Sequence, residues 1–223
     1  MPGYFETLRD EIEALLPESP SLVMDIGCGK GVTSQWLKQI RPNITTVGVE
    51  IDKSAAAVAA SVVDTVLVAD LDKGLDALDS YRGRIDLLLL LDVLEHLHDP
   101  WTRLQEFKTF LAPAGVVIAS IPNVRNVKVL VPLLLKGDWQ YQDSGILDRT
   151  HLRFFTRRTV LELFAGAGYE IQQIACTGPL QPGRIKSVSG QIAFFANLML
   201  VGLLKDFIAH QYLVRAVVAG NSG

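Results

Sequence analysis

The sequence predicts an α/β fold built on a doubly wound, mostly parallel sheet with helices on both faces. Apolar runs of strand length alternate with segments of helical periodicity along most of the chain, the pattern of repeated strand–helix–strand units. These runs are rich in Val, Ile and Leu and lack polar alternation, as in strands that are covered on both faces. A glycine-rich turn follows the first run, where a strand would pass into a helix.

The expected elements follow in order along the chain. An amphipathic helix is expected from Tyr4 to Leu16, and Pro17 ends it. Seven strands are expected, at residues 21–27, 44–50, 64–70, 84–92, 116–122, 169–176 and 211–218. Helices are expected up to residue 40, through the alanines at 55–60, and over 100–111, 125–135 and 157–166, with Thr156 capping the last.

The composition is that of a single globular domain. The chain has 223 residues, of which 49% are apolar, and a length in this range fits one domain. Its 21 Lys and Arg against 24 Asp and Glu leave a net charge of −3, which argues against a nucleic-acid partner. The two cysteines form neither a metal-ligand pattern nor a disulfide framework, and this favours a reducing, cytoplasmic location.

Two segments bear on membranes and export. The acidic N-terminus lacks a basic region followed by an apolar run, so it does not read as a secretory signal. An uncharged insertion at 187–204 has 18 residues with polar interruptions, whereas a membrane span needs about 20 mostly apolar residues. No stable membrane insertion is therefore expected. A buried helix is the favoured interpretation of this insertion, with an acceptor wall, a dimer face or a membrane-grazing surface as alternatives.

The turn after the first strand reads VMDIGCGKG, which places Gly27, Gly29 and Gly31 between a strand and a helix. Glycines there let a ligand approach the backbone closely. Their spacing is G-x-G-x-G, whereas a dinucleotide site has G-x-G-x-x-G. Asp25, two residues before the first glycine, would repel a pyrophosphate but suits a ligand ending in an ammonium group, such as the methionine portion of S-adenosylmethionine. An ordinary tight turn is the alternative.

Acidic residues also end the next two strands. Glu50 is placed to accept hydrogen bonds from both hydroxyls of a ribose, a device that NAD sites share. Asp70 can accept a hydrogen bond from an adenine amino group, and Leu71 can offer its backbone N–H. Each acid alone could simply cap a helix. Three acids on successive strand ends, together with the glycine turn, favour a nucleoside site.

At this point the sequence resembles the class I S-adenosylmethionine-dependent methyltransferases. The matching motifs are DIGCGKG (25–31), VGVEID (47–52), ADLDKG (69–74), DLLLLLDVLEHLHDP (86–100) and IPN (121–123). The VGVEID and ADLDKGL motifs are similar to the methionine-biosynthesis MetW group, LDVLEHLHDP to the ubiquinone-type O-methyltransferases, and GILDRTHLRFFT (145–156) to methyltransferases associated with bacterial surface polysaccharides. The segment 136–156 departs from the MetW pattern.

The resemblance implies a seven-stranded, Rossmann-like methyltransferase fold in one domain, 1–223. Within it, an N-terminal helix falls in 1–20, a cofactor-binding half in 21–122, and an acceptor-side half in 123–223. S-adenosyl-L-methionine is the expected cofactor and S-adenosyl-L-homocysteine the product. The expected cofactor-binding residues are Asp25, Gly27, Cys28, Gly29, Gly31, Glu50, Ile51, Asp70, Leu71 and Asp92.

His151 is the candidate general base, and His96, which by resemblance could contact the cofactor or the acceptor, is expected to assist it. His151 lies in DRTHLRFF, in the acceptor-side half, where Asp148 and Arg153 could orient it. The alternative is a structural histidine that ties this loop to the sheet. His96 follows the fourth strand, beyond the expected position of the cofactor. Asp92, Glu95 and His96 are also similar to a metal site of the ubiquinone-type enzymes, but no metal is predicted here because the usual first Glu is replaced by the shorter Asp92.

The expected function is methylation of an oxygen on a small molecule or saccharide, in bacterial polysaccharide biosynthesis. Four arginines, at 149, 153, 157 and 158, would suit a phosphate or carboxylate on the acceptor, although a solvated helix start is the simpler and more common explanation. A MetW-like subunit that binds the cofactor without turnover, and an NAD-dependent oxidoreductase, are the rival functions. A homodimer is the expected assembly.

Overall fold

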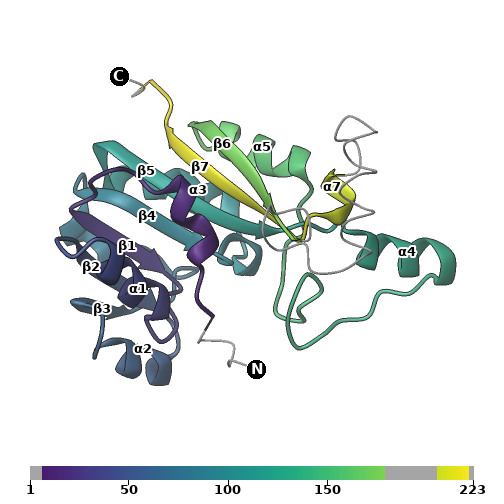
Figure 1. Cartoon of the computed structure of the whole chain (residues 1–223), viewed down its shortest axis with the longest axis horizontal. Coiled ribbons are helices and arrows are strands. Elements are labelled where there is room, and N and C mark those ends of the chain that lie inside the picture. The colour runs from purple at the N-terminus through teal and green to yellow at the C-terminus, as the bar shows by residue number, and fades with distance from the viewer. Residues whose placement is uncertain (1–6, 179–204, 221–223) are drawn as a thin grey trace.

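The computed structural model describes residues 7–178 and 205–220, and the insertion at 187–204 lies outside them. Its centre is a seven-stranded sheet in the order β3-β2-β1-β4-β5-β7-β6 (Figure 1). The strands are β1 (Leu22–Ile26), β2 (Thr45–Glu50), β3 (Thr65–Val68), β4 (Ile85–Leu91), β5 (Leu111–Pro122), β6 (Tyr169–Thr177) and β7 (Gln211–Val218). Only β7 runs antiparallel to its neighbours, so the predicted fold class is confirmed.

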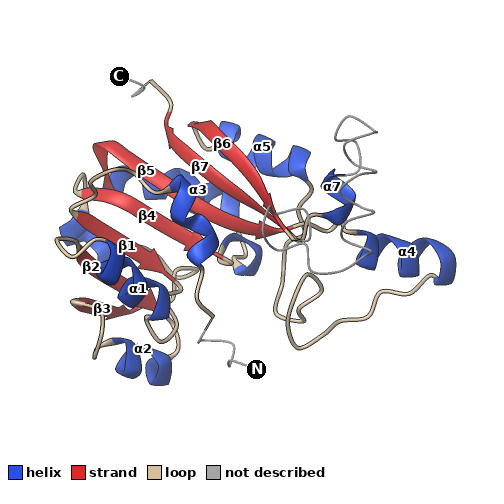
Figure 2. Ribbon diagram, in the orientation of Figure 1, coloured by secondary structure: helices blue, strands red, loops and turns tan. Residues whose placement is uncertain are grey.

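Helices pack on both sides of the sheet (Figure 2). The α-helices are α1 (Val32–Ile40), α2 (Lys53–Ala59), α3 (Pro100–Phe107), α4 (Val127–Lys136), α5 (Arg157–Gly166) and α7 (Lys205–Ile208). Short 3₁₀ helices are η2 (Asp10–Leu15), η3 (Asp76–Tyr81), η4 (Leu94–His96) and η5 (Lys108–Phe110). Thr156 caps α5 as predicted, since its side chain accepts a hydrogen bond from the Thr159 amide.

The N-terminal α-helix predicted over Tyr4–Leu16 is wrong for the residues that the structure describes. Its place is taken by the single 3₁₀ stretch η2, which buries Ile12 and Leu15. Leu16 already has extended backbone angles next to Pro17, because a residue before proline is driven out of the helical region. The chain therefore leaves the helical conformation at Leu16 and continues in an extended one.

The core consists of two apolar layers, one on each side of the sheet. Along β4, Leu88 and Leu90 belong to the layer that α3 and α5 cover. Leu87 and Leu89 belong to the other layer, with η2 and α1. All four of these leucines are fully buried. This double burial explains why the strand reads as an uninterrupted apolar run.

The strand order reverses beside β1, and this reversal marks the place where a ligand is expected to bind. The chain proceeds from β1 outward through β2 to β3, then returns to the other side of β1 with β4. In open α/β sheets, ligands bind at the carboxyl ends of the strands at such a switch point. The glycine turn follows β1, so it opens directly onto this position.

Gly31, at the start of α1, offers a test of the turn. Its φ is +79°, and an added Cβ would lie 2.8 Å from methyl carbons of Val62 and Val63. We expect Gly31→Ala to lower the free energy of unfolding by about 3 kcal/mol, because left-handed strain and overpacking add together. Gly83 is the matched control, since its φ of +68° is similar but nothing lies within 4 Å of an added Cβ. Gly83→Ala should cost only about 1 kcal/mol, and equal losses in urea unfolding would contradict the packing argument.

Candidate functional site

Backbone hydrogen bonds hold the glycine turn in shape, both to β2 and within the turn itself. The Gly27 amide donates to the Val49 carbonyl at 2.8 Å, and the Gly31 amide donates to the Cys28 carbonyl at 2.9 Å. Gly27, Gly29 and Gly31 all have positive φ, which L side chains rarely adopt. Glycine therefore recurs at every second position because the backbone adopts a positive φ at each of them.

Glu50 ties this turn to the end of β2. Its carboxylate accepts a hydrogen bond from the Gly29 amide at 2.8 Å and another from the Asp52 amide at 2.9 Å. Both bonds are made within the protein, yet two carboxylate oxygens can accept about four hydrogen bonds. Glu50 thus shapes the turn and keeps acceptor capacity for a ligand hydroxyl.

Asp25 lies inside β1 and is buried. The Ser34 hydroxyl donates to Asp25 Oδ2 at 3.0 Å. Burial raises the pKa of Asp25 to about 7, because removing the carboxyl from water disfavours its charged form, while Ser34 and Arg9 pull the pKa down in part. The protein alone therefore leaves the charge of this carboxylate incompletely compensated.

Of the other residues predicted around the cofactor, two are buried and two are more exposed. Leu71 and Cys28 are buried. The Cys28 side chain packs against Gly48, where an added Cβ would lie 2.6 Å from the sulfur, and burial raises the pKa of its thiol. Ile51 is 62% exposed at the end of β2. Asp70 accepts a hydrogen bond from the Asp72 amide at 3.1 Å and forms an ion pair with Lys73 at 3.0 Å.

Asp92 lies at the end of β4, with the only positive φ (+56°) among non-glycine residues in the described part of the chain. Its carboxylate binds the guanidinium of Arg9 and accepts a hydrogen bond from Gln211 Nε2 at 2.6 Å. The Ser120 hydroxyl donates to the same carboxylate at 3.1 Å, and Arg9 donates to Ser120 Oγ at 2.9 Å. Asp92 therefore belongs to a partly buried polar network at the carboxyl ends of β4 and β5.

Sequence reasoning missed Arg9, Ser120 and Gln211 as members of this network. Arg9 is the only cation among the first 29 residues, which was the available signal. It is nonetheless buried, and it makes ion pairs with both Glu11 and Asp92. A buried guanidinium is retained where several acceptors satisfy it, so Arg9 fixes the N-terminal segment against the site.

The segment after α4 returns to the same end of the sheet. The amides of Leu152 and Arg153 both donate to the Glu95 carbonyl, at 2.8 and 3.0 Å. His96 Nδ1 lies 3.2 Å from the Thr150 carbonyl oxygen. The structure thus brings His151, predicted from the acceptor-side half, beside η4 of the cofactor-binding half.

The rings of His96 and His151 are in contact. The spacing and periodicity of the sequence could not predict this pairing. Their ring centres are 4.7 Å apart, in an edge-to-face arrangement. His151 Nδ1 lies 3.1 Å from the Ile146 carbonyl oxygen, so Nδ1 carries the proton and Nε2 keeps its lone pair. Burial lowers the pKa of His151, which favours a neutral imidazole. Asp148 was expected to orient this ring, but its carboxylate instead binds Thr150, at 2.7 and 2.8 Å.

Glu95 completes the cluster. Its side chain is 1% exposed and lies 4.0 Å from His151 Nε2. Neither carboxyl oxygen has a hydrogen-bond partner among the described residues. Burial and, to a smaller extent, the charge of Asp92 raise the pKa of Glu95 well above its usual value, which favours the neutral carboxyl. Candidate ligand atoms of Glu95, His96 and His151 lie within 4.8 Å of one another. Asp92, which the sequence motif grouped with Glu95, is committed to Arg9 instead.

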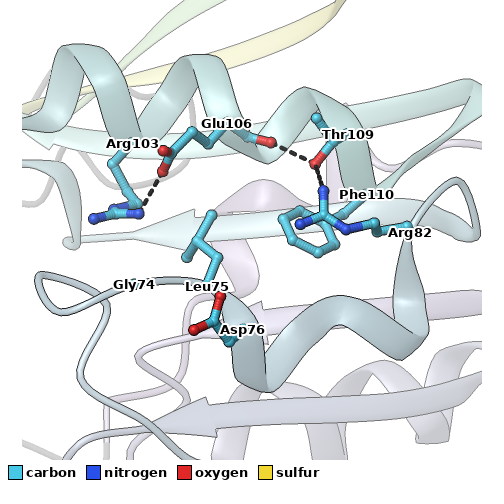
Figure 3. Close-up of a pocket in the computed structure, with 8 residues that line it drawn as sticks. All are labelled: Gly74, Leu75, Asp76, Arg82, Arg103, Glu106, Thr109 and Phe110. Carbon is cyan, nitrogen blue, oxygen red and sulfur yellow. Dashed lines mark hydrogen bonds and ion pairs between the residues drawn. The ribbon is translucent and has the colours of Figure 1, made fainter.

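A separate pocket of about 360 Å³ lies between η3 and the α3–η5 segment (Figure 3). Figure 3 shows Arg103 and Glu106 directed at each other and the Arg82 guanidinium over the Phe110 ring, 4.8 Å from its centre. Arg82 also donates to Thr109 Oγ1 at 2.8 Å. None of the predicted site residues lines this pocket.

The four arginines at 149–158 do not converge on one point. Arg149 pairs with Asp143 at 2.9 Å, and Arg158 pairs with Glu162 at 2.7 Å. Arg153 donates to the His98 carbonyl and lies over the Trp101 ring, 5.6 Å from its centre. The contacts of Arg149 and Arg158 are those of a solvated surface, which favours the simpler of the two interpretations for them.

The methyltransferase domain family matches residues 3–174 of this chain. The ubiquinone biosynthesis O-methyltransferase of Shewanella halifaxensis is 24% identical over 142 residues, which span 63% of this chain and 60% of that protein. The enzyme of the same name from Cupriavidus pinatubonensis is 26% identical over 155 residues, covering 68% of this chain and 61% of that protein. The matched region thus spans under two thirds of these relatives.

Solved structures show the same fold. A SAM-dependent methyltransferase from Archaeoglobus fulgidus superposes with a TM-score of 0.62 at 19% identity, covering 92% of this chain and 89% of that one. A putative methyltransferase of Haloferax volcanii, solved in complex with the Trm112 methyltransferase activator, gives 0.62 at 14% identity, covering 93% and 87%.

The switch-point glycine turn and the carboxylates on successive strand ends define a nucleoside-cofactor enzyme of the doubly wound class. Since the family match covers most of the chain, the protein belongs to the methyltransferase domain family. Its recognition as a class I S-adenosylmethionine-dependent methyltransferase is thereby confirmed, in family and in fold.

Proposed function

We propose that this protein transfers a methyl group from S-adenosylmethionine to an oxygen of a small-molecule or saccharide acceptor. The observation that carries the proposal is Asp25, a buried carboxylate beside the glycine turn whose pKa is raised to about 7. An ammonium group at this position would supply the charge that the protein lacks. The diphosphate of NAD would add a second negative charge there instead.

The residues present fit S-adenosylmethionine. Asp25 would hold its ammonium group, Glu50 its ribose hydroxyls, and Asp70 with the Leu71 amide its adenine. Gly27 and Gly29, which adopt positive φ, carry no side chain, so a ligand can approach the backbone closely there. When bound, the cofactor supplies an electrophilic methyl group, and the chain has to orient the acceptor and take its proton.

The His96–His151 pair is proposed to take that proton. A neutral imidazole is a base at neutral pH, and burial favours the neutral form of His151. A proton accepted at His151 Nε2 would face the carboxyl of Glu95, 4.0 Å away. The less buried His96 ring, 4.7 Å from His151, extends the pair toward the surface.

Oxygen is proposed as the methylated atom because the curated relatives are named O-methyltransferases. A saccharide acceptor, a role in bacterial polysaccharide synthesis, a cytoplasmic location and a homodimer are the finer parts of the proposal. They rest on the GILDRTHLRFFT resemblance and on composition. Among the described residues, no helix is long and apolar enough to cross a membrane.

Two measurements test the function. S-adenosylhomocysteine should raise the melting temperature of the protein, whereas NAD at equal concentration should not; the reverse would indicate an oxidoreductase. A methyl-transfer screen over sugar nucleotides and quinone precursors should then find an acceptor. Cofactor binding without transfer to any pool, together with stoichiometric capture of an enzyme partner, would favour the rival function of a cofactor-binding subunit.

A further inference from the structure

Helix α4 extends away from the sheet (Figure 1), and several of its apolar side chains are exposed. Of its ten residues only Val129 is buried. Leu134 and Leu135 are 77% and 78% exposed, and Val127 and Val131 are exposed as well. Exposed apolar side chains are common one at a time, but a contiguous group on one element marks a contact surface.

Four of the five exposed apolar residues share one side of the helix, and Leu133, which is 37% exposed, lies off it. Val127, Val131, Leu134 and Leu135 stand at positions i, i+4, i+7 and i+8, which fall on a single face. We call this surface the α4 outer face. In a surface helix of a globular domain, such an apolar face normally packs on the core, whereas the apolar face of α4 is exposed.

The charge on α4 favours an anionic partner for the α4 outer face. The chain has a net charge of −3, yet α4 carries Lys128 and Lys136 and no acidic residue. Lys128 lies next to the apolar face by helical position, and a long lysine side chain can extend its ammonium group beyond an apolar surface. Trp139 and Tyr141 follow the helix, and aromatic residues of this kind are enriched where an apolar phase meets water. A helix with an apolar face and basic flanks fits an anionic lipid surface.

The base of α4 is firmly attached to the fold. Asn126 Nδ2 donates to the carbonyls of Ile208 and Ala209, at 3.1 and 2.9 Å. Asn126 Oδ1 accepts a hydrogen bond from the Lys128 amide at 2.9 Å and caps the helix. The outer face is therefore presented in a fixed direction, which lowers the entropic cost of docking.

We propose that the α4 outer face docks on the surface of an anionic lipid bilayer, with the helix lying in the plane of the interface. A second copy of the chain is a poorer occupant, because packing two outer faces together would place the Lys128 of each copy at the rim, where α4 offers no acidic residue to pair with it. Docking of this kind requires no membrane-spanning helix, and none is found among the described residues. The proposal does not depend on the methyl-transfer reaction.

Vesicle sedimentation of the full chain tests this. Vesicles of phosphatidylcholine mixed with phosphatidylglycerol should bind the protein, and vesicles of phosphatidylcholine alone should bind it clearly less. Leu134→Gln combined with Leu135→Gln should reduce binding to the mixed vesicles about tenfold or more, since two leucines lose their apolar burial. Val58→Gln, which changes a 48% exposed apolar residue on α2, is the matched control and should bind as the wild type does.

A second variant tests the charge. Lys128→Glu combined with Lys136→Glu should weaken binding to the mixed vesicles while leaving the melting temperature within about 2 °C of the wild type, as for surface substitutions. Failure of the wild type to bind mixed vesicles, or undiminished binding by the double leucine variant, would overturn the proposal. So would a stable dimer in sedimentation equilibrium that the leucine variant dissociates, because the face would then be an interface between copies.

Discussion

Asp25→Asn is expected to reduce the affinity for S-adenosylhomocysteine about ten- to a hundredfold, because a charged partner of the ligand's ammonium group becomes neutral. The substitution should not unfold the protein. Asp25 is buried and its pKa is raised from 3.8 to about 7, so its ionisation destabilises the folded chain as pH rises toward and through 7. Without ligand, the variant should therefore be at least as stable as the wild type at about pH 8.

The same linkage predicts the pH dependence of binding. An ammonium group favours the ionised form of Asp25, so binding of S-adenosylhomocysteine releases a proton at pH values below about 7. Wild-type affinity should rise as the pH is raised through this range, and the slope should be absent in Asp25→Asn. Calorimetry in two buffers of different ionisation enthalpy measures both quantities. Wild-type affinity and slope in the variant would remove Asp25 from the cofactor site.

His151→Ala is expected to lower turnover about 10²–10⁴-fold while leaving the affinity for S-adenosylhomocysteine unchanged, because the variant loses a positioned base and no cofactor contact. The pKa of His151 is lowered, so the imidazole stays neutral below its ordinary value of 6.5. The wild-type rate should consequently fall only in more acidic solution, as the ring becomes protonated. His98→Ala is the control, since His98 is largely exposed and pairs with Asp72.

Three outcomes of this second experiment are informative. Unchanged turnover with the true acceptor would show that His151 is structural, holding the loop through the Ile146 carbonyl. Loss of turnover in His96→Ala alone would assign the base to the other ring of the pair. Inhibition by a chelator, reversed by a divalent cation, would show that Glu95, His96 and His151 act together as ligands rather than as a base.

The sequence was sufficient for the local parts of the site. The turn around Gly27 and Gly31 could be predicted because positive φ requires glycine, and that requirement is readable from residue type. Glu50 and Asp70 could be placed because the ends of buried parallel strands are marked by the loss of apolar character. The parallel, doubly wound arrangement was predicted from the repeated strand–helix pattern, whereas the order of the strands came from the structure.

The sequence did not reveal which side chains serve one another. Arg9 contacts Asp92 across 83 positions and Gln211 across 202, and no local pattern records such a pairing. The hydrogen bonds from Thr150 to the carboxylate of Asp148 could not be read from the sequence, which indicated only that Asp148 could orient His151 or bind an acidic acceptor. Among the described residues, the Glu95 carboxyl has no hydrogen-bond partner. Only the folded structure shows this, because it depends on the contact between η4 and residues 150–153.

By itself, the sequence determined the backbone of the cofactor site, because glycine conformation and strand termination are properties of short segments. Only the tertiary structure decided the electrostatics of the site. A pKa depends on burial and on charges brought together from distant parts of the chain, as for Asp25 and Glu95. The outward direction of the α4 apolar face was likewise decided by folding, since periodicity shows that a helix has an apolar side but not which way that side will point.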